Sequence, residues 1–167
     1  MDPAVEQGVD DDEDIEYRKE ALTMALYVAI CLLAALVVLP EDTTEDHAIG
    51  VIWGTTLGLA LAHWFAFRVA ARMVAQGPMR PHDALAAGAQ LAGAAAVAAI
   101  ATVPTFFWSG ADEIDAVIFV LAAFIALVGY GSARTSGGSK VRSVAYAGGL
   151  LVVALGVVLV KVLVSGH

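Results

Sequence analysis

Five long apolar runs dominate this sequence, at 21–39, 49–67, 84–107, 114–133 and 143–164. A helix that crosses a bilayer needs about 20 largely apolar residues, because the hydrocarbon core is roughly 30 Å thick. The runs are continuously apolar and do not alternate every second residue, as the strands of a membrane barrel would. With 59% hydrophobic and only 16% charged residues, the chain is predicted to be an all-α integral membrane protein with five transmembrane helices.

The segment before the first run is acidic and carries much of the net charge of −8. Residues 1–16, MDPAVEQGVDDDEDIE, have no basic region typical of a signal peptide, so the first run is expected to remain as a transmembrane helix. A block of like charges is usually solvated and disordered, although a docking role for a basic partner stays open. We therefore expect a disordered tail over 1–16 and one transmembrane domain over 17–167.

Basic residues alternate between the connections and predict an orientation. They cluster before the first run, after the second and between the last two, whereas 40–48 and 108–115 contain none. Lys161, near the end of the fifth run, is the exception, and its long stem can reach the interface. Since cytoplasmic loops are enriched in Lys and Arg, the N-terminus is expected in the cytoplasm and the C-terminus outside, in a multi-pass protein of the cell membrane.

Small residues recur at helical spacing in two of the runs. They are Gly54, Gly58 and Ala62 in the second run, and Ala145, Gly149 and Gly156 in the fifth. Because apolar burial does not drive helices together in lipid, close backbone approach through small residues has to contribute. Both stripes are predicted to be helix-packing surfaces, in the bundle or across a homo-oligomer interface.

The third run is built almost entirely from Ala and Gly over 84–101. A helix with so little side-chain bulk makes a poor lipid-facing surface, so it is expected to be the helix most surrounded by protein. Pro104 is expected to kink or end it, with Thr102 as a local hydrogen-bond donor.

Three polar residues inside the apolar runs form the candidate intramembrane site. At about 100° per residue, Thr56 and His63 share one face of the second helix. His63 and Gln90 lie at similar depths on consecutive antiparallel helices and are expected to approach each other, with Tyr130 or Tyr146 as a further partner. One interpretation is a structural hydrogen bond, and the other is a proton or ion path through His63.

Few other residues in the sequence suggest a metal site or a catalytic site. Cys31 is the single cysteine, and neither His47 nor the pair His82 and Asp83 has the spacing of a zinc site. No combination of nucleophile, base and orienting residue is recognisable, so no enzyme activity, cofactor or metal is expected, and no nucleic-acid partner.

The closing hairpin, 124–163, contains Gly, Ala and Val around a short basic turn, GYGSARTSGGSK. In this it is similar to the end of the vacuolar iron transporter family. That family's acidic and methionine metal ligands have no counterpart here, since the first run contributes only Met24. No family is therefore assigned.

Two functions are compatible with these features. The first is a homo-oligomeric channel or transporter-like protein for a cation or proton, favoured by the acidic outer connections and by His63. The alternative is a non-catalytic accessory or scaffold subunit of a larger membrane complex, favoured by the small-residue stripes and the acidic tail. The expected partners are the lipid bilayer and either further copies of the chain or another membrane protein.

Overall fold

The structure, a computed structural model, describes residues 3–40, 43–75, 81–108 and 111–165. Its helices are α1 (Pro3–Leu36), α2 (Glu45–Ala75), α3 (Pro81–Thr102), the 3-10 helix η1 (Val103–Phe106), α4 (Ala111–Thr135) and α5 (Lys140–Ser165). The described part of the chain contains no strand. Each predicted apolar run thus forms a helix, and most of these helices extend beyond the run at both ends.

Four helices within the described residues, α1 to α4, are long and apolar enough to cross a membrane. Their candidate spans are Asp14–Leu36, Glu45–Ala70, Ala84–Phe106 and Asp112–Thr135. The prediction of an all-helical membrane protein is confirmed at this level, because each span reaches the length that a bilayer requires.

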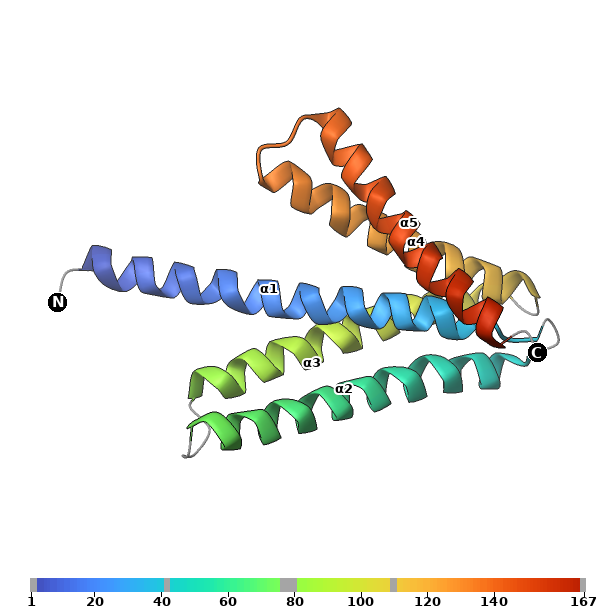
Figure 1. Cartoon of the computed structure of the whole chain (residues 1–167), viewed down its shortest axis with the longest axis horizontal. Coiled ribbons are helices and arrows are strands. Elements are labelled where there is room, and N and C mark those ends of the chain that lie inside the picture. The colour runs from blue at the N-terminus through green and yellow to red at the C-terminus, as the bar shows by residue number, and fades with distance from the viewer. Residues whose placement is uncertain (1–2, 41–42, 76–80, 109–110, 166–167) are drawn as a thin grey trace.

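Successive helices run in opposite directions (Figure 1). The N-terminal ends of α1, α3 and α5 lie toward one end of the molecule, together with the C-terminal ends of α2 and α4. We call this the basic end, because the following basic residues lie near the ends of the apolar segments there: Arg18, Lys19, Arg68, Arg72, Arg134, Lys140 and Arg142. Arg80, a basic residue after the second run, and residues 41–42 of the connection 40–48 lie outside the described residues.

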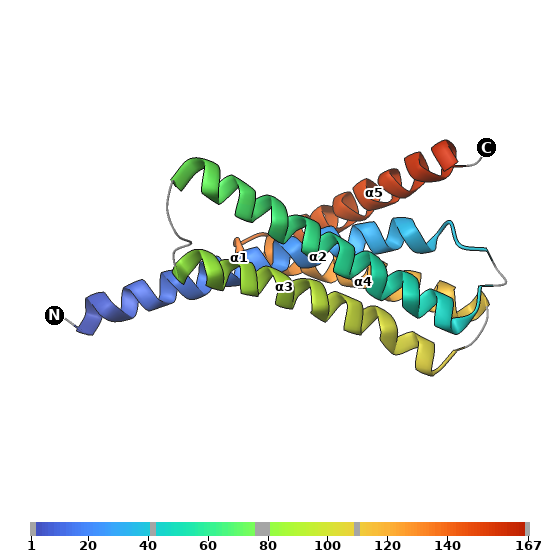
Figure 2. The same cartoon turned by 90° about the horizontal axis from the view of Figure 1, so that it is seen from below.

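Helix α1 is the central helix, lying between the α2–α3 pair and the α4–α5 pair (Figures 1 and 2). In its apolar window 44% of the residues are buried, compared with 33% in that of α3. The expectation that the third helix is the most surrounded is therefore wrong. Its small side chains let α1 approach one face closely, but Ala92, Ala95 and Ala99 remain exposed on the other.

The tightest helix crossing is at Gly93 of α3. A Cβ atom added there would overlap the carbonyl oxygen of Ala21 on α1. Beyond this crossing, toward the other end, the core is continuous and apolar: Val28, Leu32 and Leu36 of α1 are essentially inaccessible. A second tight crossing joins α4 to α5, where a Cβ on Gly129 would lie 3.3 Å from the Cα of Ala147.

The acidic N-terminal segment is helical in the structure, where the sequence predicted disorder. Helix α1 begins at Pro3 and continues without interruption into the apolar span. Proline suits the first position of a helix, and acidic residues near a helix N-terminus interact favourably with its dipole. Extending a helix that the membrane span has already nucleated costs little.

Pro104 ends α3, as the sequence predicted. The helix stops at Thr102 and tightens into η1, whose second residue is Pro104. The hydroxyl of Thr102 donates a hydrogen bond to the Ala98 carbonyl at 2.7 Å and accepts one from the Trp53 indole of α2 at 3.1 Å. This local donor therefore also connects α2 to α3.

Candidate functional site

Three polar side chains lie at nearly the same depth on three helices. Glu20, His63 and Gln90 lie six, seven and six residues from the basic ends of their candidate spans. At a rise of about 1.5 Å per residue, each lies about 9 to 11 Å from that end. The antiparallel arrangement of α1, α2 and α3 thus brings together residues that are up to 70 positions apart in sequence.

Glu20 and Gln90 are directly bonded. The Gln90 amide Nε2 donates to the Glu20 carboxylate Oε2 at 2.6 Å, in a partly buried position between α1 and α3. A hydrogen bond to a charged acceptor is stronger than one between neutral groups. The bond lies one turn from the tight crossing at Gly93, where the backbones of α1 and α3 come closest.

The bonded pair lines a cavity of about 310 Å³ together with His63. Its remaining lining residues are Thr23, Met24 and Tyr27 of α1. A carboxylate, an imidazole, an amide and a phenol therefore border one space. These groups can accept or donate a proton, and their oxygen atoms can coordinate a small cation.

His63 and Gln90, which the sequence placed at similar depth, both line this cavity. They also border a void of about 10 Å³ beside Ala87, close to the smallest volume that holds a water molecule. The amide of Gln90 is bonded to Glu20, however, and within the described chain His63 makes no hydrogen bond. The imidazole is exposed at the cavity, on the lining opposite α1.

Thr56 is separate from the cavity. It is buried, and its hydroxyl donates to the Ile52 carbonyl at 2.8 Å within α2. It belongs to the inward stripe of α2, which repeats every four residues as Ala48, Ile52, Thr56 and Ala60. The predicted polar face of α2 therefore does point inward at Thr56, but the residue has a local hydrogen-bond role.

The two tyrosines considered as further partners do not line this cavity. Tyr146 lies on α5 and borders a different groove, next to α4 and α1. Tyr130 is partly buried on α4. The partner that sequence reasoning missed is Glu20, which lies between the acidic tail and the first apolar run. Its position four residues before Met24 and seven before Tyr27, on one helical face, was the available signal.

The predicted small-residue surfaces do not pack within the chain. Gly54 and Gly58 of α2 have no heavy atom within 4 Å of an added Cβ, and Ala62 is exposed. Gly149 and Gly156 of α5 are equally open, and Ala145 is exposed. The glycines that permit close helix contact are instead Gly93 and Gly129, and the two predicted stripes form no such contact within the described chain.

The border of the membrane near the site is marked by an aromatic and a basic residue. The Arg68 guanidinium lies 5.1 Å from the ring centre of Trp64, one residue beyond His63. Such a pair typically anchors a helix where the hydrocarbon core meets the headgroups.

The chain matches no family model, and neither a curated protein nor a solved structure matches it. The interpretation of the cavity rests on its geometry.

Proposed function

We propose that this protein is a homo-oligomeric, transporter-like or channel-like protein that moves a proton or a small cation across the membrane. The observation that carries this proposal is the convergence of Glu20, Gln90 and His63 on one cavity within the candidate spans. Ionisable groups are costly at membrane depth and are found there mainly where they serve a function. A histidine that titrates near neutral pH suits proton exchange.

The proposal includes five membrane spans, with the basic end in the cytoplasm of a cell and α5 as the fifth span. The sequence of α5, from Lys140 to Ser165, has the required length and is mainly apolar. The basic residues gathered at one end favour a cytoplasmic location for that end. In this orientation the cavity lies in the cytoplasmic half of the bundle.

Beyond the cavity, a path for ions has to form either through movement of the helices or between copies of the chain. The half of the bundle away from the basic end is filled by buried residues such as Leu32, Leu36 and Ala98. Ions cannot cross packed apolar side chains. The exposed glycines of α2 support assembly into oligomers, in which the conduit would lie between subunits.

The test is ion flux in proteoliposomes that contain the full chain. We expect proton, sodium or potassium flux, and we expect Glu20→Gln to reduce it to the level of empty liposomes because the carboxylate is removed while the shape is kept. His63→Ala is expected to reduce the flux as well. Asp14→Asn and His47→Ala are matched controls, since both residues are exposed and lie outside the cavity.

Two results would overturn the transport proposal. One is the absence of flux for all three ions in the wild-type protein. The other is unchanged flux in both Glu20→Gln and His63→Ala, combined with lower thermal stability, which would leave these residues a structural role only.

The alternative function is an accessory subunit of a larger membrane complex. The observation that favours it is the open glycine surface of α2, at Gly50, Gly54 and Gly58, none of which meets another heavy atom within 4 Å of an added Cβ. Such a surface suits a partner helix. Absence of flux together with stable association with a different protein would support this alternative.

A further inference from the structure

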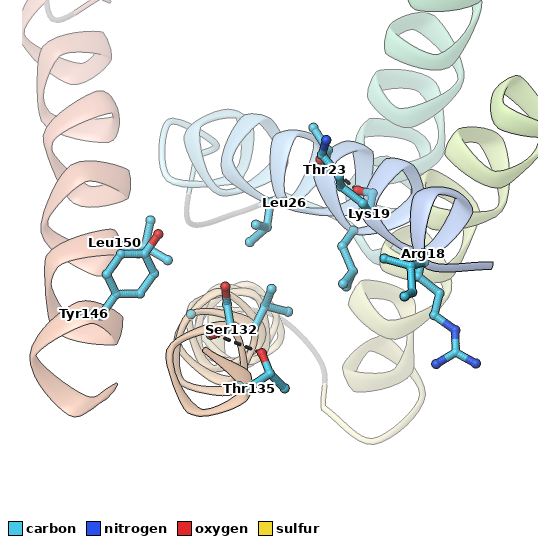
Figure 3. Close-up of a pocket in the computed structure, with 13 residues that line it drawn as sticks. Arg18, Lys19, Thr23, Leu26, Ser132, Thr135, Tyr146 and Leu150 are labelled. Atoms are coloured by element: carbon cyan, nitrogen blue, oxygen red, sulfur yellow. Dashed lines mark hydrogen bonds between the residues drawn. The ribbon is translucent and has the colours of Figure 1, made fainter. Parts of the chain in front are cut away.

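A second and larger groove lies on the opposite side of α1, facing α4 and α5 (Figure 3). Its volume is about 760 Å³, within the range of small-molecule binding sites. Leu22 and Leu26 of α1 border it together with Leu150 of α5. Its body is therefore apolar and lies within the candidate spans.

The end of the groove nearest the basic end is different. Arg18 and Lys19 of α1 border it there, both exposed and neither in an ion pair with another described residue. Hydroxyl groups of Ser132, Thr135 and Tyr146 border the groove from α4 and α5. Figure 3 shows Ser132 and Tyr146 beside the space between the three helices, with the Arg18 guanidinium pointing away from α4 and α5.

A smaller adjoining pocket adds a third cation. It has a volume of about 250 Å³ and shares Ser132 and Tyr146 with the groove. Arg142 of α5 borders it. The groove thus has an apolar body and a polar end that Arg18 and Lys19 of α1 line directly, while Arg142 of α5 lines the adjoining pocket.

No described acidic side chain lines this groove. On α1, Asp14 and Glu16 occupy helix positions about 100° from Ile15, which borders the groove. Glu20 is bonded to Gln90 on the α3 side of α1. The described side chains that line the polar end of the groove are therefore basic or carry hydroxyl groups, although the whole chain is acidic.

We propose that this groove binds one anionic phospholipid from the leaflet at the basic end of the bundle. The acyl chains lie along Leu22, Leu26 and Leu150, and the headgroup phosphate lies at the end of the groove that Arg18 and Lys19 border, next to the pocket that Arg142 borders. Basic side chains at the membrane surface attract anionic lipid, while hydroxyl groups donate hydrogen bonds to phosphate oxygens. This proposal is independent of the transport proposal, because the groove and the polar cavity lie on different sides of α1.

The experiment is native mass spectrometry of the full chain in detergent, with added phosphatidylglycerol or phosphatidylcholine of identical acyl chains. We expect one tightly bound phosphatidylglycerol and weaker binding of phosphatidylcholine. Arg18→Ala with Lys19→Ala is expected to weaken phosphatidylglycerol binding by about fivefold for each cation removed. The charge-matched control is Arg68→Ala with Arg72→Ala on α2, which does not border the groove.

A filling variant tests the apolar part of the groove. Gly131 borders the groove and has no heavy atom within 4 Å of an added Cβ, so Gly131→Leu extends into open space. We expect it to displace the lipid, whereas Gly148→Leu, at an equally open glycine outside the groove lining, should leave binding unchanged.

Three results would overturn the proposal. Equal binding of the two lipids would indicate a nonspecific lipid shell. Displacement of the bound phosphatidylglycerol by glycerol phosphate, which has no acyl chains, would indicate that only the headgroup is recognised and that the apolar groove does not bind the acyl chains. A lipid-free dimer of the chain whose formation is blocked by Gly131→Leu would show that a second copy fills the groove. The comparison of the two lipids needs no variant and therefore holds even if a substitution prevents folding.

Discussion

Glu113 of α4 is the most deeply buried acidic side chain in the described chain, with only 1% of its surface exposed. Its Oε1 atom has no hydrogen-bond partner, and the carboxylate of Glu45 on α2 is close enough to act on it electrostatically. Sequence reasoning grouped it with the acidic residues of the outer connections. Burial of a polar atom without a partner costs free energy, so this residue is predicted to destabilise the fold.

We expect Glu113→Gln to leave the free energy of unfolding unchanged or to raise it by up to about 1 kcal/mol, because the substitution removes the charge and keeps the shape. Thermal unfolding in detergent measures the effect. Asp112→Asn, at an exposed neighbour, is the control and should change stability by less than about 0.5 kcal/mol. A loss above about 1 kcal/mol for Glu113→Gln would mean that the carboxylate has a stabilising partner in the membrane.

At the scale of the helix, the packing of α3 depends on one glycine. Gly93 allows the backbone of α3 to contact that of α1 at Ala21, whereas Gly88 on the same helix faces open space. The two glycines look alike in the sequence, since both lie among alanines. Only Gly93 is therefore structurally required, and the bond between Glu20 and Gln90 one turn away depends on the same close approach.

We expect Gly93→Ala to lower the free energy of unfolding by about 1 to 3 kcal/mol, because the added methyl group forces the two backbones apart. Gly88→Ala is the matched control and should be neutral or stabilising by up to about 1 kcal/mol, since alanine favours the helix. Thermal unfolding in detergent compares the two. Equal stability of both variants would contradict a tight crossing at Gly93.

At the scale of the whole molecule, α1 separates two spaces of different chemistry. The polar cavity lies toward α2 and α3, and the apolar groove lies toward α4 and α5. Thr23 of α1 borders both, and its hydroxyl donates to the Lys19 carbonyl at 2.8 Å. The glycine stripe of α2 faces away from the core, so assembly through it would leave both spaces intact.

We expect the native protein, extracted in mild detergent, to have a mass that is a multiple of its 17.2 kDa chain. Gly54→Leu with Gly58→Leu should shift it toward the single chain, because bulky side chains prevent close approach of helices between copies. Gly88→Leu is the control, at an exposed glycine of α3. A wild-type mass equal to one chain, measured with its bound detergent subtracted, would contradict a homo-oligomer.

The sequence by itself determined the helices and their alternation. Apolar length specifies membrane helices directly, because no other environment stabilises runs such as 114–133 in isolation. It also placed His63 and Gln90 at one depth, since helical rise is constant, and it placed the end of α3 at Pro104 because proline cannot continue a helix.

Tertiary structure decided which surfaces meet. The sequence offered several small-residue faces of similar composition, and only the packing of α1 against α3 made Gly93 a contact while leaving Gly54 and Gly58 open. The same packing made Glu20 the partner of Gln90. Helix periodicity defines the faces of each helix, but the rotation of one helix against another depends on the packing of all five together.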